Sequence, residues 1–70
     1  MSITFKTYKQ GDIYIEARWD KCLPHFHCIV CEKRADGLYH TTKDLTYNTE
    51  KEATRSFIRQ VKKVQKGALR

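Results

Sequence analysis

Residues 49–67 read TEKEATRSFIRQVKKVQKG, and this stretch decides the fold because its apolar side chains have helical spacing. They recur every three or four residues, which places them within an arc of about 80° on a helix. These apolar residues are Ala53, Phe57, Val61 and Val64. Thr49, followed three residues later by Glu52, predicts a capping box for the first turn, and Gly67 is expected as the C-cap. The stretch is therefore expected to form an amphipathic helix whose apolar side packs on another element.

Before this helix, apolar and polar side chains alternate, as is typical of β-strands. We expect strands over residues 3–8, 13–19, 25–33 and 38–47, of which the last alternates least regularly. Gly11 and the Asp36-Gly37 pair supply hairpin turns, since glycine tolerates positive φ. The predicted fold class is α+β. It is an antiparallel meander of three to four strands with one C-terminal amphipathic helix packed on one face, in the order β-β-β-β-α.

The whole chain, residues 1–70, is expected to be one small domain because 70 residues cannot build two cores. With 40% hydrophobic and 31% charged residues, the composition is that of a folded chain. There is no apolar run of about 18 residues and no apolar leader, which predicts no membrane contact and a cytoplasmic location. The odd number of cysteines, 3, favours reduced thiols in such a compartment.

Strand alternation divides the expected sheet into two faces. The face under the helix is expected to carry Ile3, Phe5, Ile13, Ile15, Ala17, Phe26, Cys28 and Val30, with Trp19 at its edge. The open face is expected to carry Lys6, Tyr8, Tyr14, Glu16, Arg18, His25, His27, Ile29, Cys31 and Lys33. This mixture of aromatic, basic and apolar groups is typical of a binding surface.

Positive charge is concentrated in the helix. Lys and Arg number 14 against 8 acidic residues, a net charge of +6, and no acid occurs from Arg55 onward. On a helical wheel the cations lie opposite the apolar stripe. They are Arg55, Arg59, Lys62, Lys63 and Lys66. A solvated helix would also place its charges there, but it would typically include Glu for i,i+4 pairs. An unmixed basic side indicates attraction to phosphate or to an acidic protein surface.

Cysteine and histidine side chains cluster around the start of the third expected strand. Cys22, His25, Cys28 and Cys31 could hold zinc as an alternative, because thiolate and imidazole suit a tetrahedral ion. A strand would, however, point Cys28 and Cys31 to opposite faces. We therefore expect no metal or other cofactor. A thiolate at Cys31 with His27 or His25 as its base would lack an orienting group and an oxyanion hole, so no enzymatic activity is expected.

The step YNTEKEA at residues 47–53 resembles a module found at the N-terminus of phage and transposon integrases. That module is a β-β-β-α DNA-binding unit whose strands commonly end in an aromatic-x-Thr-x-x-Glu-Ala step. The resemblance implies that the sheet face turned away from the helix enters the major groove. By position, this implies contacts from Lys6, Tyr14, Arg18, His25, His27 and Lys33. The chain differs from the module by an apparent fourth strand and by lacking the catalytic part of an integrase.

In size and charge the chain is also similar to small phage-encoded inhibitors of host machinery, including the anti-CRISPR proteins. One hypothesis is a non-enzymatic protein of a phage or mobile element, acting in the host cytoplasm. It would bind nucleic acid or a nucleoprotein complex through the basic helix side and the open sheet face. The alternative is an inhibitor that blocks a host protein surface, with Tyr14, Trp19 and Ile29 as anchors. A homodimer in which a second copy covers the open face is a third hypothesis.

Overall fold

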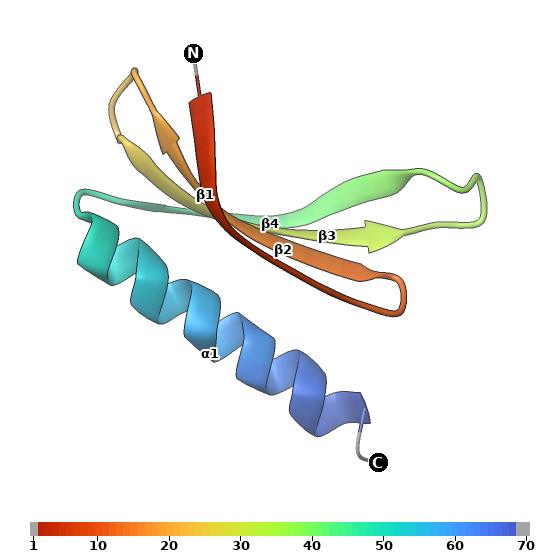
Figure 1. Cartoon of the computed structure of the whole chain (residues 1–70). Coiled ribbons are helices and arrows are strands. Elements are labelled where there is room, and N and C mark those ends of the chain that lie inside the picture. Colours follow the sequence, from red (N-terminus) through yellow and green to blue (C-terminus); the bar gives the residue numbers. More distant parts are fainter. Residues whose placement is uncertain (1, 69–70) are drawn as a thin grey trace.

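Four antiparallel strands followed by one helix make up the computed structural model, which describes residues 2–68 (Figure 1). The elements are β1 (Ser2–Gln10), β2 (Ile13–Asp20), β3 (Phe26–Lys33), β4 (Tyr39–Tyr47) and α1 (Glu50–Ala68). The strands lie in the order β1-β2-β3-β4, so each strand pairs with its neighbour in the sequence. This confirms the predicted α+β meander, with four strands and one C-terminal helix.

The two outer connections are tight turns built on glycine. Gly11 and Gly37 have φ values of 59° and 80°, a left-handed conformation that costs glycine little. Beside Gly37, the backbone N–H of Leu38 donates to the Asp36 carboxylate at 2.9 Å. That hydrogen bond, with a second one to His40, holds the pKa of Asp36 below its usual value. Both glycine turns stand where the sequence predicted them.

The helix begins as predicted and ends later than predicted. Its first residue, Glu50, follows Thr49, whose hydroxyl oxygen accepts a hydrogen bond from the Glu52 backbone N–H at 3.2 Å. This bond satisfies a free donor of the first turn. The predicted C-cap at Gly67 is wrong, because α1 continues through Gly67 to Ala68, and within residues 2–68 positive φ occurs only at Gly11 and Gly37.

The core lies where α1 crosses one face of the sheet, chiefly over β2 and β3 (Figure 1). Ile15, Ala17, Cys28 and Ala53 are each 0% exposed. The partly buried apolar residues around them are Tyr8, Ile13, Leu45, Tyr47, Phe57, Val61 and Val64. The predicted apolar stripe of the helix is thus confirmed. Two polar residues, Ser56 and Gln60, are also buried on α1, and Ser56 accepts a hydrogen bond from the Tyr47 hydroxyl at 2.8 Å.

A β-bulge in β1 changes which residues face the helix. The register shifts between Thr4 and Lys6, so Phe5 is the extra residue and Lys6 stands opposite Ala17. A shift of one residue reverses the faces of everything that follows it in the strand. Lys6 and Tyr8, predicted on the open face, therefore lie on the helix-facing side. Tyr8 packs against the core, and Lys6 remains exposed.

His25 was also predicted on the open face, and this placement is wrong. β3 begins at Phe26, so His25 belongs to the preceding loop. That loop is closed by the backbone N–H of Asp20, which donates to the His25 carbonyl at 2.6 Å. The imidazole stacks on Trp19 with 6.0 Å between ring centroids, and its Nδ1 lies 2.9 Å from the Asp20 carbonyl oxygen. Only His27 remains on the open face.

Shortening the most buried branched side chain should destabilise the domain measurably. We expect Ile15→Val to lower the free energy of unfolding by about 0.5–1.5 kcal/mol, because removing a methyl group from this fully buried side chain leaves a void that its neighbours do not fill. The matched control is Ile3→Val, since Ile3 is 52% exposed, and its effect should stay within about 0.5 kcal/mol. Urea unfolding followed by circular dichroism measures both. Equal effects would contradict the assignment of the core to this face.

Candidate functional site

The two surfaces that the sequence singled out lie on opposite sides of the molecule. Because α1 packs on one face of the sheet, its outward side and the open sheet face point in opposite directions (Figure 1). The Cα trace measures 35 × 26 × 16 Å, so both surfaces belong to one thin slab. A single flat partner can therefore contact one of these surfaces or the other, but not both at once.

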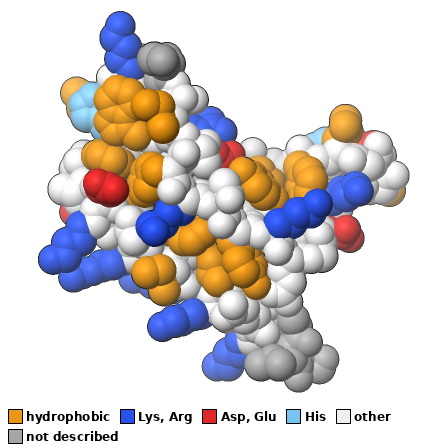
Figure 2. Space-filling view, viewed as in Figure 1, with side chains coloured by type: hydrophobic (Ala, Val, Ile, Leu, Met, Phe, Trp, Pro, Cys, Tyr) orange, Lys and Arg blue, Asp and Glu red, His pale blue; other side chains and the backbone are white. Residues whose placement is uncertain are grey.

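The outward side of α1 is a continuous row of cations, which we call the cationic helix surface. Its predicted members are all exposed: Arg55, Arg59, Lys62, Lys63 and Lys66. Lys51 is also exposed on this side of the helix, before the stretch from Arg55 onward that contains no acid. Lysine and arginine side chains project along the outer edge of the helix in Figure 2. At about 1.5 Å per residue, the row from Arg55 to Lys66 is about 16 Å long.

None of the ion pairs found in residues 2–68 involves this row. The cations are consequently not neutralised by acids of the described part of the chain. Holding like charges side by side on one helix is unfavourable until a partner or counterions neutralise them. Arg70, which adds to the positive charge of this segment in the sequence, lies outside the described residues.

The open sheet face, in contrast, contains acids that pair with its cations. Arg18 donates from Nη2 to Glu16 Oε1 at 2.9 Å, and Glu16 also accepts a hydrogen bond from the Thr4 hydroxyl at 2.6 Å. His27 Nδ1 lies 3.0 Å from Asp44 Oδ1. Glu16 is only 7% exposed, so its carboxylate depends on these partners. The sequence did not place Asp44 on the open face, because alternation alone does not reveal how β3 pairs with β4. That pairing brings Asp44 opposite Ile29.

The remaining part of the open face is aromatic and less accessible than predicted. Tyr14 packs against Tyr39 at 6.0 Å between ring centroids, and Lys9 Nζ lies 5.7 Å from the Tyr39 ring. Burial raises the pKa of the Tyr14 phenol above its ordinary value. Ile29, expected as an anchor for a partner or a second copy, is only 8% exposed and offers little area to bury. Lys33 is exposed at the end of β3.

The cysteines do not gather around a common point. Cys22 is exposed in a loop and Cys28 is buried under the helix, while Cys31 lies on the opposite face of the same strand. Burial raises the pKa of the Cys28 thiol, against the opposing effect of a hydrogen bond with Ser56. Among residues 2–68, no three His, Cys, Asp or Glu side chains lie close enough together to hold a metal ion. The alternative zinc set of Cys22, His25, Cys28 and Cys31 is therefore not assembled.

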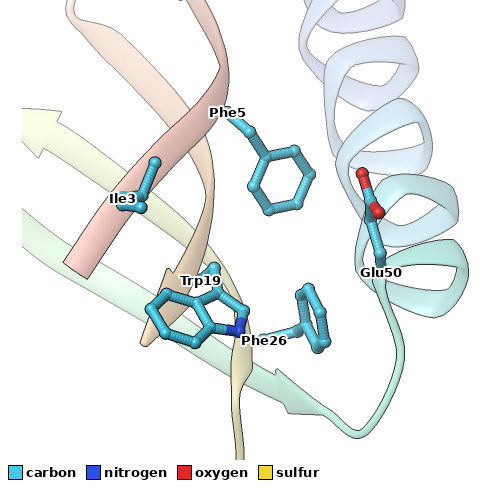
Figure 3. A pocket seen from close by; sticks show the side chains of 5 residues that line it. All are labelled: Ile3, Phe5, Trp19, Phe26 and Glu50. Carbon is cyan, nitrogen blue, oxygen red and sulfur yellow. The ribbon is translucent and has the colours of Figure 1, made fainter. Parts of the chain in front are cut away.

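A third feature, which the sequence did not indicate, is an open cavity at the edge of the sheet. It is lined by Ile3, Phe5, Trp19, Phe26 and Glu50, has a volume of about 390 Å³, and is here called the aromatic hollow (Figure 3). Three of its residues, Ile3, Phe5 and Phe26, were predicted to lie under the helix. The helix begins beside them, at Glu50, and runs away from this end of the sheet (Figure 1). The rings are therefore half-buried instead of enclosed.

Comparison with models of known protein families, with curated proteins and with solved structures finds no match to this chain. The resemblances to integrase modules and to phage-encoded inhibitors stay predictions. No helix in residues 2–68 combines the length and the apolar character needed to cross a membrane.

The placement of the cysteines predicts an order of chemical reactivity. With iodoacetamide at pH 8, we expect Cys22 to react first and Cys28 to stay unmodified until the protein unfolds, because Cys28 is buried and its pKa is raised. Mass spectrometry of the digested protein follows each thiol, with the urea-denatured chain as the control in which all react. Equimolar Zn²⁺ should leave the rate at Cys22 unchanged. Joint protection of Cys22 and Cys31 by zinc would instead show that they share an ion.

Proposed function

We propose that this chain is a non-enzymatic protein that binds nucleic acid, alone or within a nucleoprotein complex, through the cationic helix surface. The observation that carries the proposal is the row of exposed cations on α1, whose members form no ion pair within the described residues. Lysine and arginine neutralise phosphates and release the counterions condensed on a nucleic acid, which supplies sequence-independent affinity. The proposed partner is therefore a phosphate backbone.

The dimensions of the row suit this partner. Each strand of a duplex carries one phosphate per about 3.4 Å of axis, so a row about 16 Å long runs beside about five phosphates. Contacts of this kind orient a protein on nucleic acid without reading its bases. The integrase-type arrangement, in which the sheet face enters the groove, has weaker support. Two of its proposed contact residues, Arg18 and His27, are already held by Glu16 and Asp44.

Reversing two charges of the row tests the proposal directly. The double variant Arg59→Glu, Lys63→Glu should bind short labelled duplex DNA, single-stranded DNA and RNA more weakly than the unmodified protein. The salt dependence should also become less steep: the magnitude of the slope of log K against log salt should fall by about two, because two phosphate contacts are lost. Fluorescence anisotropy titrations at about 50 and 200 mM salt measure both quantities.

The matched control is Lys9→Glu, Lys33→Glu on the open sheet face. Both double variants lower the net charge by the same amount, so a difference between them reports the position of the contact and not the overall charge. We expect the control to retain most of the affinity and the salt slope. If the control is the weaker binder, the sheet face is the nucleic-acid surface and the helix part of the proposal is wrong.

One observation favours the alternative of a protein-surface inhibitor. Ile58 is 46% exposed on the outward side of α1, three residues after Arg55 and four before Lys62, and so lies beside both. An apolar side chain surrounded by cations suits an acidic protein surface with a small pocket, in which the charges steer association and the apolar group is buried. In this alternative the same surface is used and only the partner differs.

The variant Ile58→Ala separates the two candidates. If the partner is a phosphate backbone, its affinity for duplex DNA should change by less than about twofold, because the cations are untouched. If the partner is an acidic protein, loss of the buried anchor should weaken that complex by about tenfold or more. The affinity for duplex DNA is measured by the same anisotropy titration. Binding of an acidic protein is measured by comparing the proteins from nuclease-treated lysate that are retained on the unmodified protein and on the variant. A loss of DNA affinity above about fivefold would contradict a contact made only by cations.

A further inference from the structure

The aromatic hollow has walls made of rings in different orientations. Phe5 and Phe26 meet edge to face, with 6.3 Å between centroids and an interplanar angle of 81°. Trp19 stands beside Phe26, its register partner on the neighbouring strand, and the Glu50 side chain extends from the first turn of α1 (Figure 3). A group that enters the hollow would meet aromatic surfaces on several sides and one carboxylate.

The walls are held in place by the structure around them. The β-bulge in β1 has Phe5 as its extra residue, and such bulges re-aim a side chain at the edge of a sheet. Trp19 is stacked by His25 at an interplanar angle of 15°, and His25 is in turn within hydrogen-bonding distance of the Asp20 carbonyl, at 2.9 Å. The rings of the hollow are therefore arranged before any ligand arrives, which lowers the entropic cost of binding.

The lining selects a ligand by charge. It includes the carboxylate of Glu50 and no lysine or arginine. The helix N-terminus contributes a partial charge of about +0.5, which the full negative charge of the Glu50 carboxylate outweighs. Aromatic faces are also negative, because the ring quadrupole places electron density above and below the plane. A phosphate-bearing ligand would be repelled here, whereas a cation would be attracted.

We propose that the aromatic hollow is a binding site for a small quaternary ammonium ion. The positive methyl groups of such an ion contact ring faces favourably, bury apolar surface against Ile3, and need no hydrogen-bond acceptor. The carboxylate of Glu50 balances the charge. The volume of about 390 Å³ lies in the lower part of the range of small-molecule sites, so a whole small ion can enter. This site is separate from the cationic helix surface and goes beyond the proposed function.

The test uses choline and its neutral isostere 3,3-dimethylbutan-1-ol, which have the same shape and differ in charge. With the full chain at about 150 mM salt, where charges more than about 8 Å apart are screened, choline methyl protons should shift upfield as the rings enclose them. The isostere should bind at least about fivefold more weakly, because it lacks the attraction to the rings and to Glu50. Proton NMR titration of the ligand signal measures both affinities without depending on a protein chromophore.

Two variants locate the site. Glu50→Gln should weaken choline binding by about fivefold or more and leave the isostere unchanged, because only the charge is removed. Its matched control is Glu52→Gln, a change in the same turn at a residue that does not line the hollow, and it should leave both affinities unchanged. Trp19→Ala should abolish the upfield shift. If that variant fails to fold by circular dichroism, Trp19→Phe replaces it and should reduce the choline affinity while keeping a ring.

Equal affinities for choline and the isostere would overturn the proposal, since the hollow would then be an apolar pocket without preference for a cation. A choline affinity left unchanged by both Trp19→Phe and Glu50→Gln would overturn it as well, because the ion would be bound elsewhere. Absence of any shift up to about 20 mM choline would also overturn it, because the affinity would then be weaker than the millimolar value expected for one ion in an open aromatic site.

Discussion

Close packing of α1 on the two central strands is the contact on which the rest of the structure depends. Small side chains meet there, with Ala17 and Cys28 on the sheet and Ala53 and Ser56 on the helix, all at most 2% exposed. Their size lets the helix approach the sheet closely, and larger, partly buried residues around the core, such as Phe57 and Val61, exclude water from the contact. Once this side of α1 is buried, its basic side has to face solvent, and the opposite sheet face has no helix to cover it.

The β-bulge in β1 is the second constraint, and its effect extends along the whole edge strand. With the extra residue at Phe5, the first half of β1 supplies Ile3 and Phe5 to the aromatic hollow, and the second half supplies Tyr8 to the core. An unbroken strand could not have placed Phe5 and Tyr8 on one face, because their spacing is odd. The bulge therefore allows residues on both sides of it to face the helix side of the sheet. It also moves Lys6 away from the face on which simple alternation predicted it.

The surfaces of this small domain differ in the sign of the ligand that each would attract. The cationic helix surface would attract phosphate, while the aromatic hollow, with Glu50 as its only charged lining residue, would attract a cation. Between these extremes lies the open sheet face, where Glu16 and Asp44 hold Arg18 and His27. This distribution explains why the net charge of +6 is a poor guide to any one of the surfaces. It also favours the helix over the sheet as the place where a polyanion would bind.

The sequence by itself determined the element order, the hairpin turns at Gly11 and Gly37, the start of the helix after Thr49, and the separation of apolar from basic side chains on α1. These follow from local rules, since turn chemistry, capping and periodicity involve residues close together in the chain. Only the tertiary structure decided the bulge at Phe5 and the pairing of Asp44 with His27. It also decided that His25 lies in a loop against Trp19 instead of on the open face, and that the aromatic hollow forms. Each of these depends on the register between strands or on where the helix axis crosses the sheet. Those distances are set by the packing of residues far apart in sequence, which alternation and composition do not encode.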